Sequence, residues 1–266
     1  MELAIVSDEI SKNFDEALDY ALSWGISRFE LRELQTGRVP LVDRAEIDWV
    51  RKLLREKSAT ITAVSPGIFK ATLLEKDVIK QEMTEKIFQT FRLAETLGTR
   101  RIIIFGIQKA ENEPESHYDD ALNLLGEMAL LGQKNGFRIF VENEPNFWCD
   151  TGVNTAKILK TIDSDFLRAN WDPGNALWAG EVPYPDGYRA IREFMGNFHA
   201  KDYTKQPDGS FVCQVIGEGD IDYKNHVAAV VRDHTVEQIT IETHCEPLLE
   251  KSKRNAEILT NWLNEL

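Results

Sequence analysis

Four short segments in the second half of the chain end in side chains that can bind a metal ion. Each joins a hydrophobic or β-branched run to a polar residue and a Pro or Gly breaker, the pattern of a strand that stops at a loop. The residues are Glu142 in RIFVENEP, Asp172 in RANWDPGN, His199 in NFHAKD and Glu242 in TIETHCEP. Three carboxylates and one imidazole suit Mn²⁺, Mg²⁺, Co²⁺ or Zn²⁺ with positions open for substrate, and lack the thiolates of a closed structural zinc site. We therefore predict one divalent metal ion in a catalytic site.

The segments that must position these residues repeat one unit along the chain. Short apolar runs alternate with stretches of helical period, such as residues 14–25, 45–57 and 83–98. Short strands separated by helices pair in parallel, and eight such units in a chain of this length match a closed (β/α)₈ barrel. The eight apolar runs are residues 3–7, 28–32, 59–65, 100–106, 137–142, 167–172, 197–202 and 238–243. The residues expected to end helices as C-terminal caps are Gly25, Gly98 and Gly136.

No linker, low-complexity tract or change of composition divides the chain. We therefore predict an α/β protein with a single TIM-barrel domain over residues 1–266. An open doubly wound sheet is the alternative, but no GxGxxG motif follows the first predicted strand. The four ligand segments also favour the barrel, because a barrel gathers the ends of successive strands around one axis.

Strand alternation places further polar residues beside the predicted ligands. Residues two apart on a strand share a face, so five pairs are predicted to point into the barrel. They are Glu30 and Arg32, Glu142 and Glu144, Asn170 and Asp172, His199 and Lys201, and Glu242 and His244. A barrel interior normally holds branched apolar side chains, and burying unpaired charges there costs several kcal/mol per group. The polar ring is therefore interpreted as a functional site.

The ordered strand ends resemble the xylose isomerase-like TIM-barrel superfamily, also called the sugar phosphate isomerase/epimerase family. The resemblance spans nearly the whole chain and rests on ENEP, WDPGN, FHAKD, GEGDIDY, IET and the opening VSDEISKNFDEALDYALSWGISRFELRE. That family includes ketose 3-epimerases and inosose dehydratases. The resemblance implies a metal held by Glu142, Asp172, His199 and Glu242, with the two glutamates also transferring protons. Where the epimerases carry a substrate-contacting His and an Arg, this chain has Asn175 and Lys205.

The two glutamates suggest a specific chemistry. A divalent cation that binds a carbonyl and a neighbouring hydroxyl oxygen stabilises the enediolate formed when a proton leaves the adjacent carbon. Glu142 and Glu242 end the fifth and eighth predicted strands, where they can flank a substrate as base and acid. The main hypothesis is a divalent-metal-dependent sugar isomerase or epimerase. Expulsion of a β-hydroxyl from the same enediolate gives the alternative, a dehydratase of a keto-polyol similar to the inosose dehydratases.

Two other functional classes have weaker support. A metal-dependent endonuclease with this barrel needs several zinc ions and more histidines than the five present. A noncatalytic sugar-binding protein would keep its ligand affinity after chelation and show no turnover.

Other side chains near the strand ends are predicted to contact the substrate: Lys201, Asn175, Arg32, His244, Glu144 and Trp178. Lys201 would orient substrate oxygens, although it could instead only balance the charge of carboxylates. His244 would act as acid, base or supporting residue, or alternatively bond to a loop. Trp178, with Phe69 and Trp148, would wall the pocket and stack on sugar C–H groups, unless these rings serve ordinary packing.

The charge and the apolar patterns of the chain limit which partners and which location are expected. Its formal charge of −13 comes from 44 acidic and 31 basic residues without a basic run, so a nucleic-acid partner is not expected. The first residues lack the pattern of a signal peptide, and no apolar stretch reaches about 18 residues. We expect a cytoplasmic protein without a membrane partner that acts on a small sugar or polyol. The sequence is compatible with a homodimer, although no helix face reads as an interface.

Two minor residue types complete the sequence-based predictions. Cys149, Cys213 and Cys245 are an odd, scattered set without a CxxC pair, which favours a reducing compartment over a disulfide framework. The histidines outside the strand ends are expected to face solvent: His117, His226 and His234.

Overall fold

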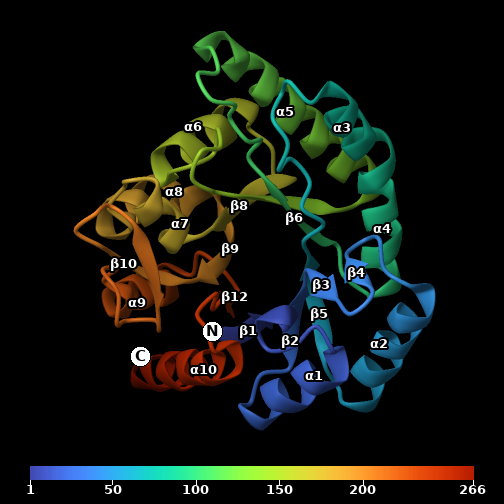
Figure 1. Ribbon diagram of the computed structural model, residues 1–266, viewed down its shortest axis with the longest axis vertical. Helices are drawn as coiled ribbons and strands as arrows, with labels where there is room; N and C mark the ends of the chain where they lie inside the picture. Colours follow the sequence, from blue (N-terminus) through green and yellow to red (C-terminus); the bar gives the residue numbers. More distant parts are fainter.

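A closed barrel of parallel strands forms the centre of the molecule (Figure 1). The computed structural model describes residues 1–266. The eight barrel strands coincide with the eight predicted apolar runs, which confirms the predicted (β/α)₈ barrel. They follow chain order around the barrel, and the last pairs with the first to close it. The strands are β1 (Glu2–Val6), β2 (Arg28–Leu31), β5 (Thr60–Val64), β6 (Arg101–Phe105), β7 (Arg138–Glu142), β8 (Leu167–Trp171), β9 (Met195–Ala200) and β12 (Gln238–Ile241).

Helices surround the barrel and connect its successive strands, as Figure 1 shows. A π-helical segment, Glu82–Lys86, joins two of them, and the predicted helix-capping glycines at positions 25, 98 and 136 all have positive φ. The helices are α1 (Phe14–Ser23), α2 (Arg44–Glu56), α3 (Lys76–Gln81), α4 (Ile87–Thr96), α5 (Tyr118–Asn135), α6 (Gly152–Ile162), α7 (Pro173–Trp178), α8 (Tyr188–Ile191), α9 (Tyr223–Asp233) and α10 (Leu248–Glu265).

Two short antiparallel hairpins were not expected from the sequence. One, β3 (Glu33–Leu34) with β4 (Gly37–Arg38), follows barrel strand β2. The other, β10 (Asp202–Lys205) with β11 (Phe211–Gln214), follows β9. Both begin directly after the carboxyl end of a barrel strand, which is the end where TIM barrels carry their active sites.

The barrel interior is apolar in part and polar near the site. The main apolar core lies between strands and helices, while a separate small cluster of Ala63, Ile103 and Phe140 is buried. Next to the site, a buried network of hydrogen bonds links Glu30 to Asn197 and Thr240 at 2.8 and 2.7 Å. Because each buried polar group in this network has a partner, the network can support charged residues without a large desolvation cost.

The expectation that the cysteines stay unpaired is wrong. The sulfur atoms of Cys213 and Cys245 are bonded, whereas Cys149 is free and buried. Strand β11 brings Cys213 beside the loop that follows β12. The separation of 32 residues hides this proximity in the sequence.

The solvent-facing position expected for His226 is also wrong. Its side chain is fully buried, and its Nε2 accepts a hydrogen bond from Nε1 of Trp171 at 3.3 Å. His226 lies three residues after the buried Tyr223, so both side chains share the inward face of α9. The exposed His234 agrees with the prediction.

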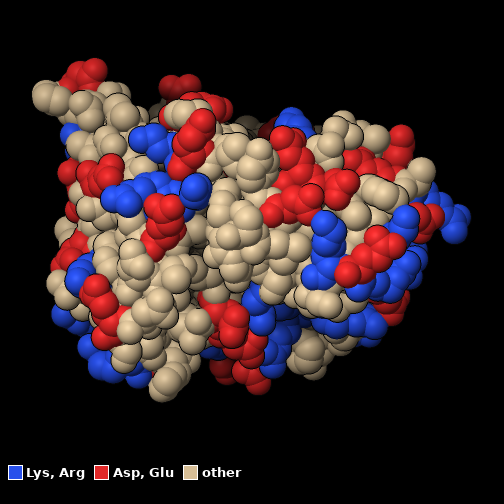
Figure 2. All heavy atoms as spheres, turned by 90° about the horizontal axis from the view of Figure 1, so that it is seen from below, with Lys and Arg blue, Asp and Glu red and all other residues tan.

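Acidic and basic side chains share the outer surface. Figure 2 shows them interspersed on one face of the molecule, and pairs such as Lys224 and Glu265, 2.9 Å apart, contribute to this mixture. None of the helices combines the length and apolar character that crossing a membrane requires.

Candidate metal centre and active site

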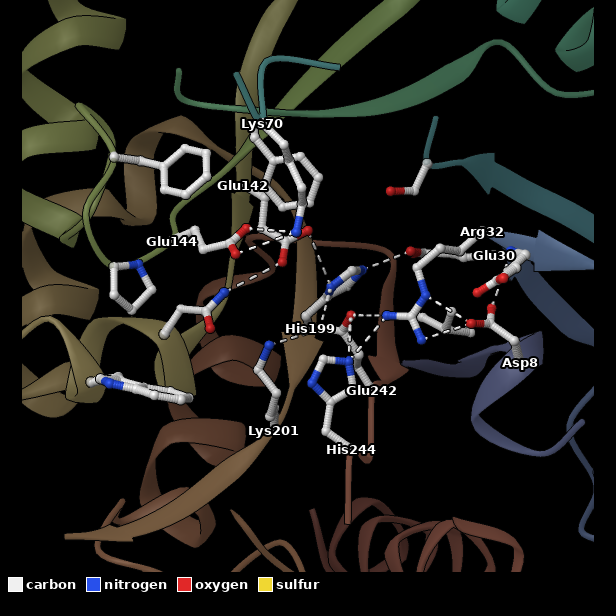
Figure 3. Close-up of a pocket in the computed structure, with 18 of the residues that line it drawn as sticks. Asp8, Glu30, Arg32, Lys70, Glu142, Glu144, His199, Lys201, Glu242 and His244 are labelled. Atoms are coloured by element: carbon white, nitrogen blue, oxygen red, sulfur yellow. Dashed lines mark hydrogen bonds and ion pairs between the residues drawn. The ribbon is translucent and has the colours of Figure 1, made fainter. Parts of the chain in front are cut away.

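A cavity of about 570 Å³ lies at the carboxyl end of the barrel (Figure 3). Residues at the ends of strands on opposite sides of the barrel line it, from Asp8 and Arg32 after β1 and β2 to Glu142 and Lys201 at β7 and β9. Only five of its 22 lining residues are hydrophobic, so the cavity suits a polar ligand of the size of a sugar better than a lipid or an aromatic compound.

Glu142, His199 and Glu242 line this cavity, and Asp172 lies beside them. One ligand-type atom from each lies within 4.8 Å of the others, and all four side chains are buried. Glu142 ends β7, Asp172 follows β8, His199 lies near the end of β9, and Glu242 follows β12. Four consecutive barrel strands therefore bring the predicted ligands to one point, and we call these residues the metal cluster. Their binding of a metal ion stays a prediction.

Local sequence fixes the position of Asp172. Its Oδ1 caps α7 by accepting a hydrogen bond from the backbone N–H of Asn175 at 2.9 Å. Pro173 follows at the start of the helix, where a missing N–H costs little. The side chain of Asn143 accepts from the N–H of Asp172 and donates to its carbonyl, both at 2.8 Å. In the WDPGN motif, Oδ1 of Asp172 is thus used to cap the helix, and Oδ2 remains available to the cluster.

Glu30 orients the imidazole of His199. Its Oε2 lies 2.7 Å from Nε2 of His199, while Nδ1 of the same ring lies 3.2 Å from Glu242 Oε2 and 3.6 Å from Glu142 Oε2. Burial raises the pKa of Glu30, but the charge and hydrogen bond of His199 outweigh burial and lower it below its usual value. A carboxylate behind a ligand imidazole fixes the tautomer that presents the other nitrogen to a metal.

The two glutamates of the cluster differ in acidity. Burial and the charge of Glu242 raise the pKa of Glu142 to about 7. Burial also acts to raise the pKa of Glu242, but Lys201, His244 and His199 outweigh it and hold this pKa well below its usual value. Without a bound cation, Glu142 therefore takes up a proton more readily than Glu242.

The cluster fits a divalent cation. Oδ2 of Asp172 is buried without a hydrogen bond, although Nζ of Lys201 lies 2.7 Å away. Three carboxylates at such close range repel one another unless positive charge offsets them. The oxygen-rich donor set with one imidazole is also typical of Mn²⁺, Mg²⁺, Co²⁺ or Zn²⁺ sites that keep open positions.

Three predicted substrate-binding residues instead contact the carboxylates around the cluster. Lys201 Nζ lies 3.0 Å from Glu242 Oε2, in addition to its contact with Asp172. Arg32 contacts Glu242 at 2.7 Å and two further carboxylates. His244 Nε2 lies 3.4 Å from Glu242 Oε1. Burial acts to lower the pKa of His244, but the charge of Glu242 outweighs burial and raises this pKa to about 9. All three line the cavity, so they also remain candidates for substrate contact.

The other three predicted substrate-binding residues also line the cavity. Nδ2 of Asn175 lies 3.4 Å from Glu142 and donates to the carbonyl of Asn143 at 2.9 Å. Glu144 pairs with Lys70 at 3.1 Å. Trp178 is 48% exposed and packs against Tyr203, with ring centroids 5.3 Å apart.

The aromatic lining was only partly predicted. Phe69 and Trp148 are buried and do not line the cavity, so the alternative of ordinary packing holds for both. The aromatic residues that line it are Phe105, Phe147, Trp178 and Tyr203. Phe105 is the last residue of β6. In the sequence it ends the apolar run IIIF, which is typical of a buried strand and gave no sign that Phe105 lines the cavity.

The fold agrees with a comparison against family models. The chain matches the xylose isomerase-like TIM barrel model over residues 18–266. The protein belongs to this family. None of the curated proteins compared with it gives a significant match.

Three solved structures share the whole fold with low sequence identity. The probable 3-DHS dehydratase AsbF from Bacillus anthracis, described as involved in petrobactin synthesis, is 18% identical, with coverage of 98% of this chain and 99% of that one and a TM-score of 0.80. A D-tagatose 3-epimerase-like protein is 19% identical, with coverage of 100% and 98% and a TM-score of 0.79. The IOLI protein with a bound zinc atom is 16% identical, with coverage of 100% and 99% and a TM-score of 0.80.

Proposed function

We propose that the protein is a divalent-metal-dependent isomerase or epimerase acting on a hydroxy ketone of the sugar class. The observation that carries the proposal is the buried convergence of Glu142, Asp172, His199 and Glu242 within 4.8 Å at a polar cavity. The family match and the epimerase-like and zinc-bound neighbours support it.

Glu142 and Glu242 are the proposed proton carriers. Both side chains line the cavity, from strands on either side of β8 and β9, so each can reach a different face of a bound substrate. One takes the proton next to the carbonyl, and the other gives a proton back. Return to the opposite face of the same carbon gives epimerisation, and delivery to the neighbouring carbon gives aldose–ketose isomerisation.

The residues around the glutamates keep them in place and in their charge states. A divalent cation, when bound by the four residues of the cluster, supplies positive charge that stabilises enediolate oxygens of the substrate. Lys201 and Arg32 hold Glu242 at 3.0 and 2.7 Å, and Asn170 Nδ2 donates to Glu142 at 3.0 Å. These contacts preorganise the carboxylates, so little reorganisation is needed during proton transfer.

A dehydratase is the second candidate. The similarity in fold to the probable 3-DHS dehydratase supports it, as do two cationic donors beside Glu242. Lys201 and His244 both line the cavity, and either can protonate a leaving hydroxyl.

The test is incubation of the metal-loaded protein with ketohexoses and inososes in D₂O. Deuterium incorporation without loss of water indicates isomerisation or epimerisation, and a product lighter by one water indicates dehydration. Chelation should abolish either reaction. Absence of exchange and of product with every substrate and each of Mn²⁺, Mg²⁺, Co²⁺ and Zn²⁺ would overturn the proposal.

A further inference from the structure

The cavity contains several cationic side chains, and most of them already have carboxylate partners. Arg32 contacts Asp8, Glu9 and Glu242 at 2.8, 2.7 and 2.7 Å. Lys201 pairs with two residues of the metal cluster, and Lys70 pairs with Glu144. These pairs balance their own charges, so they create no demand for an anionic ligand.

Arg38 is the exception among the cavity cations. It lines the cavity from strand β4 and forms no ion pair. Its Nε is buried without a hydrogen-bond partner, and its Nη2 makes one long hydrogen bond of 3.3 Å to the carbonyl of Ser65. Burial and the charge of Arg32 lower its pKa, because the carboxylates nearby do not compensate them. A half-buried guanidinium without a counter-ion is expensive unless a ligand supplies one.

The backbone makes room for this guanidinium. Gly67 lies against Arg38, and a Cβ atom at that position would stand 2.8 Å from Nε. Gly67 also has φ of +69°, a conformation that glycine adopts without strain. The space is thus shaped around the Arg38 side chain, which argues against a freely moving surface arginine.

The carboxylates that act on Arg38 are engaged elsewhere: Asp8, Glu142 and Glu33. Glu142 accepts a hydrogen bond from Asn170 at 3.0 Å and lies 3.6 Å from Nδ1 of His199. Glu33 is its cross-strand neighbour in the hairpin, but its Oε1 contacts Lys12 at 2.7 Å. Asp8 is held by Arg32. Because these partners are taken, the charge of Arg38 stays directed at the cavity.

We propose that the substrate carries a carboxylate that binds Arg38 while its hydroxy-ketone end lies at the metal cluster. This inference rests on the proposed function for the identity of the reacting end. Arg38 follows β2, which is opposite β8 and its Asp172 in the barrel, so such a substrate spans the cavity mouth. A cavity of about 570 Å³ accommodates a six-carbon acid in this way.

The chemistry of the site favours a carboxylate over a phosphate ester. One guanidinium without a partner matches a single negative charge, and its planar donors match two carboxylate oxygens. A phosphate ester carries up to two charges and three strong acceptors, which normally recruit several cations or a row of backbone N–H groups. Arg32 and Lys70, which also line the cavity, are already paired with carboxylates.

Binding of three matched polyols tests the inference in metal-free protein, where chelation of a metal by the ligand cannot contribute. The probes are D-gluconate, D-glucitol and D-glucitol 6-phosphate, which share a six-carbon chain and differ in charge, and affinity is measured by ligand-observed NMR titration. D-gluconate should bind at least about tenfold more tightly than D-glucitol, the scale of a charge-assisted hydrogen bond. Arg38→Gln should remove that difference, Arg38→Lys should restore part of it, and Arg44→Gln, at a fully exposed position, should leave it intact.

Other results of the binding experiment count against the proposal. Equal affinity for D-gluconate and D-glucitol in the unaltered protein, or no loss in Arg38→Gln, would overturn it. If D-glucitol 6-phosphate binds more tightly than D-gluconate and this binding depends on Arg38, the site recognises a phosphate rather than a carboxylate. Deuterium exchange with D-fructose and D-fructuronate separates this inference from the proposed function. No exchange with either, combined with Arg38-dependent gluconate binding, removes the isomerase assignment but keeps the anion site.

Discussion

Glu30 Oε2 lies 2.7 Å from Nε2 of His199, on the side of the ring that faces away from the metal cluster. The imidazole is thereby held between a buried carboxylate and the cluster, where Nδ1 approaches Glu242 at 3.2 Å. Three further donors, on Asn197, Gln238 and Thr240, hold Glu30 itself. The orientation of the predicted metal ligand therefore depends on a residue that lies five barrel strands earlier in the chain.

This relationship makes Glu30→Gln a test of metal binding without removal of a ligand. The amide keeps the size of the side chain but loses the charge that orients and polarises His199. Metal affinity should fall by about 10- to 100-fold, the usual effect of losing such a supporting carboxylate. Competition with a fluorescent chelator measures it, and Glu95→Gln, at an exposed position, is the control. Unchanged affinity in a folded Glu30→Gln protein would show that Glu30 only serves packing.

The proposed ligands without a proton-transfer role give a second prediction. Asp172→Asn and His199→Ala should lower metal content and activity together, because the first removes a carboxylate charge from the cluster and the second removes its imidazole donor. The barrel should remain folded, as judged by circular dichroism. Elemental analysis decides the result: full metal occupancy in both variants would remove these residues from the site.

The glutamates should behave differently from those ligands. Glu142→Gln and Glu242→Gln keep an oxygen donor but lose the carboxylate base, so much metal and substrate binding should survive while turnover falls by at least about 10²-fold. If one glutamate removes the proton and the other returns it, one variant should still exchange substrate hydrogen with D₂O and the other should not. Residual turnover above about a tenth of the original in both would contradict the two-glutamate mechanism. Lys201, Glu144 or His244 would then be the next candidates for the base.

Sequence patterns predicted the barrel and the cluster because their signals are local. Each barrel strand is a short apolar run. Asp172 directly precedes Pro173, a pattern typical of a helix N-cap. Alternation along β2 also placed Glu30 inside the barrel, but nothing in the sequence showed that it contacts His199, since that contact depends on barrel closure.

The unpredicted features depend on short or distant segments. Arg38 reaches the cavity through a hairpin whose strands have two residues each, too short for a periodic pattern. Asn143 looks like any polar residue at a strand end, although it fixes the backbone of Asp172. Cys213 and Cys245 meet only because β11 folds back beside the loop after β12.

His226 gives a prediction for the pH dependence of stability. Its burial lowers the pKa to about 3 in the folded protein, whereas an unfolded histidine titrates near about 6.5. Between these values the unfolded state binds the additional proton, so the free energy of unfolding must fall as pH drops from about 6.5 toward 3. The contribution is fully present above about pH 6.5, and about 2 kcal/mol of it should be lost at pH 5.

Urea unfolding of the His226→Gln variant at pH 7.5 and pH 5.0 isolates this effect. Glutamine keeps an acceptor for Trp171 but does not titrate in this range, so the variant should lose less stability on acidification than the unaltered protein, by about 2 kcal/mol. His234→Asn serves as the control, because His234 is exposed and has a left-handed backbone that asparagine tolerates. Since the titrating groups other than His226 and His234 are common to all three proteins, their contributions cancel in the comparison. Parallel losses in the His226→Gln and unaltered proteins would mean that His226 is protonated in the folded state at pH 5, and that its cavity admits water or a counter-charge.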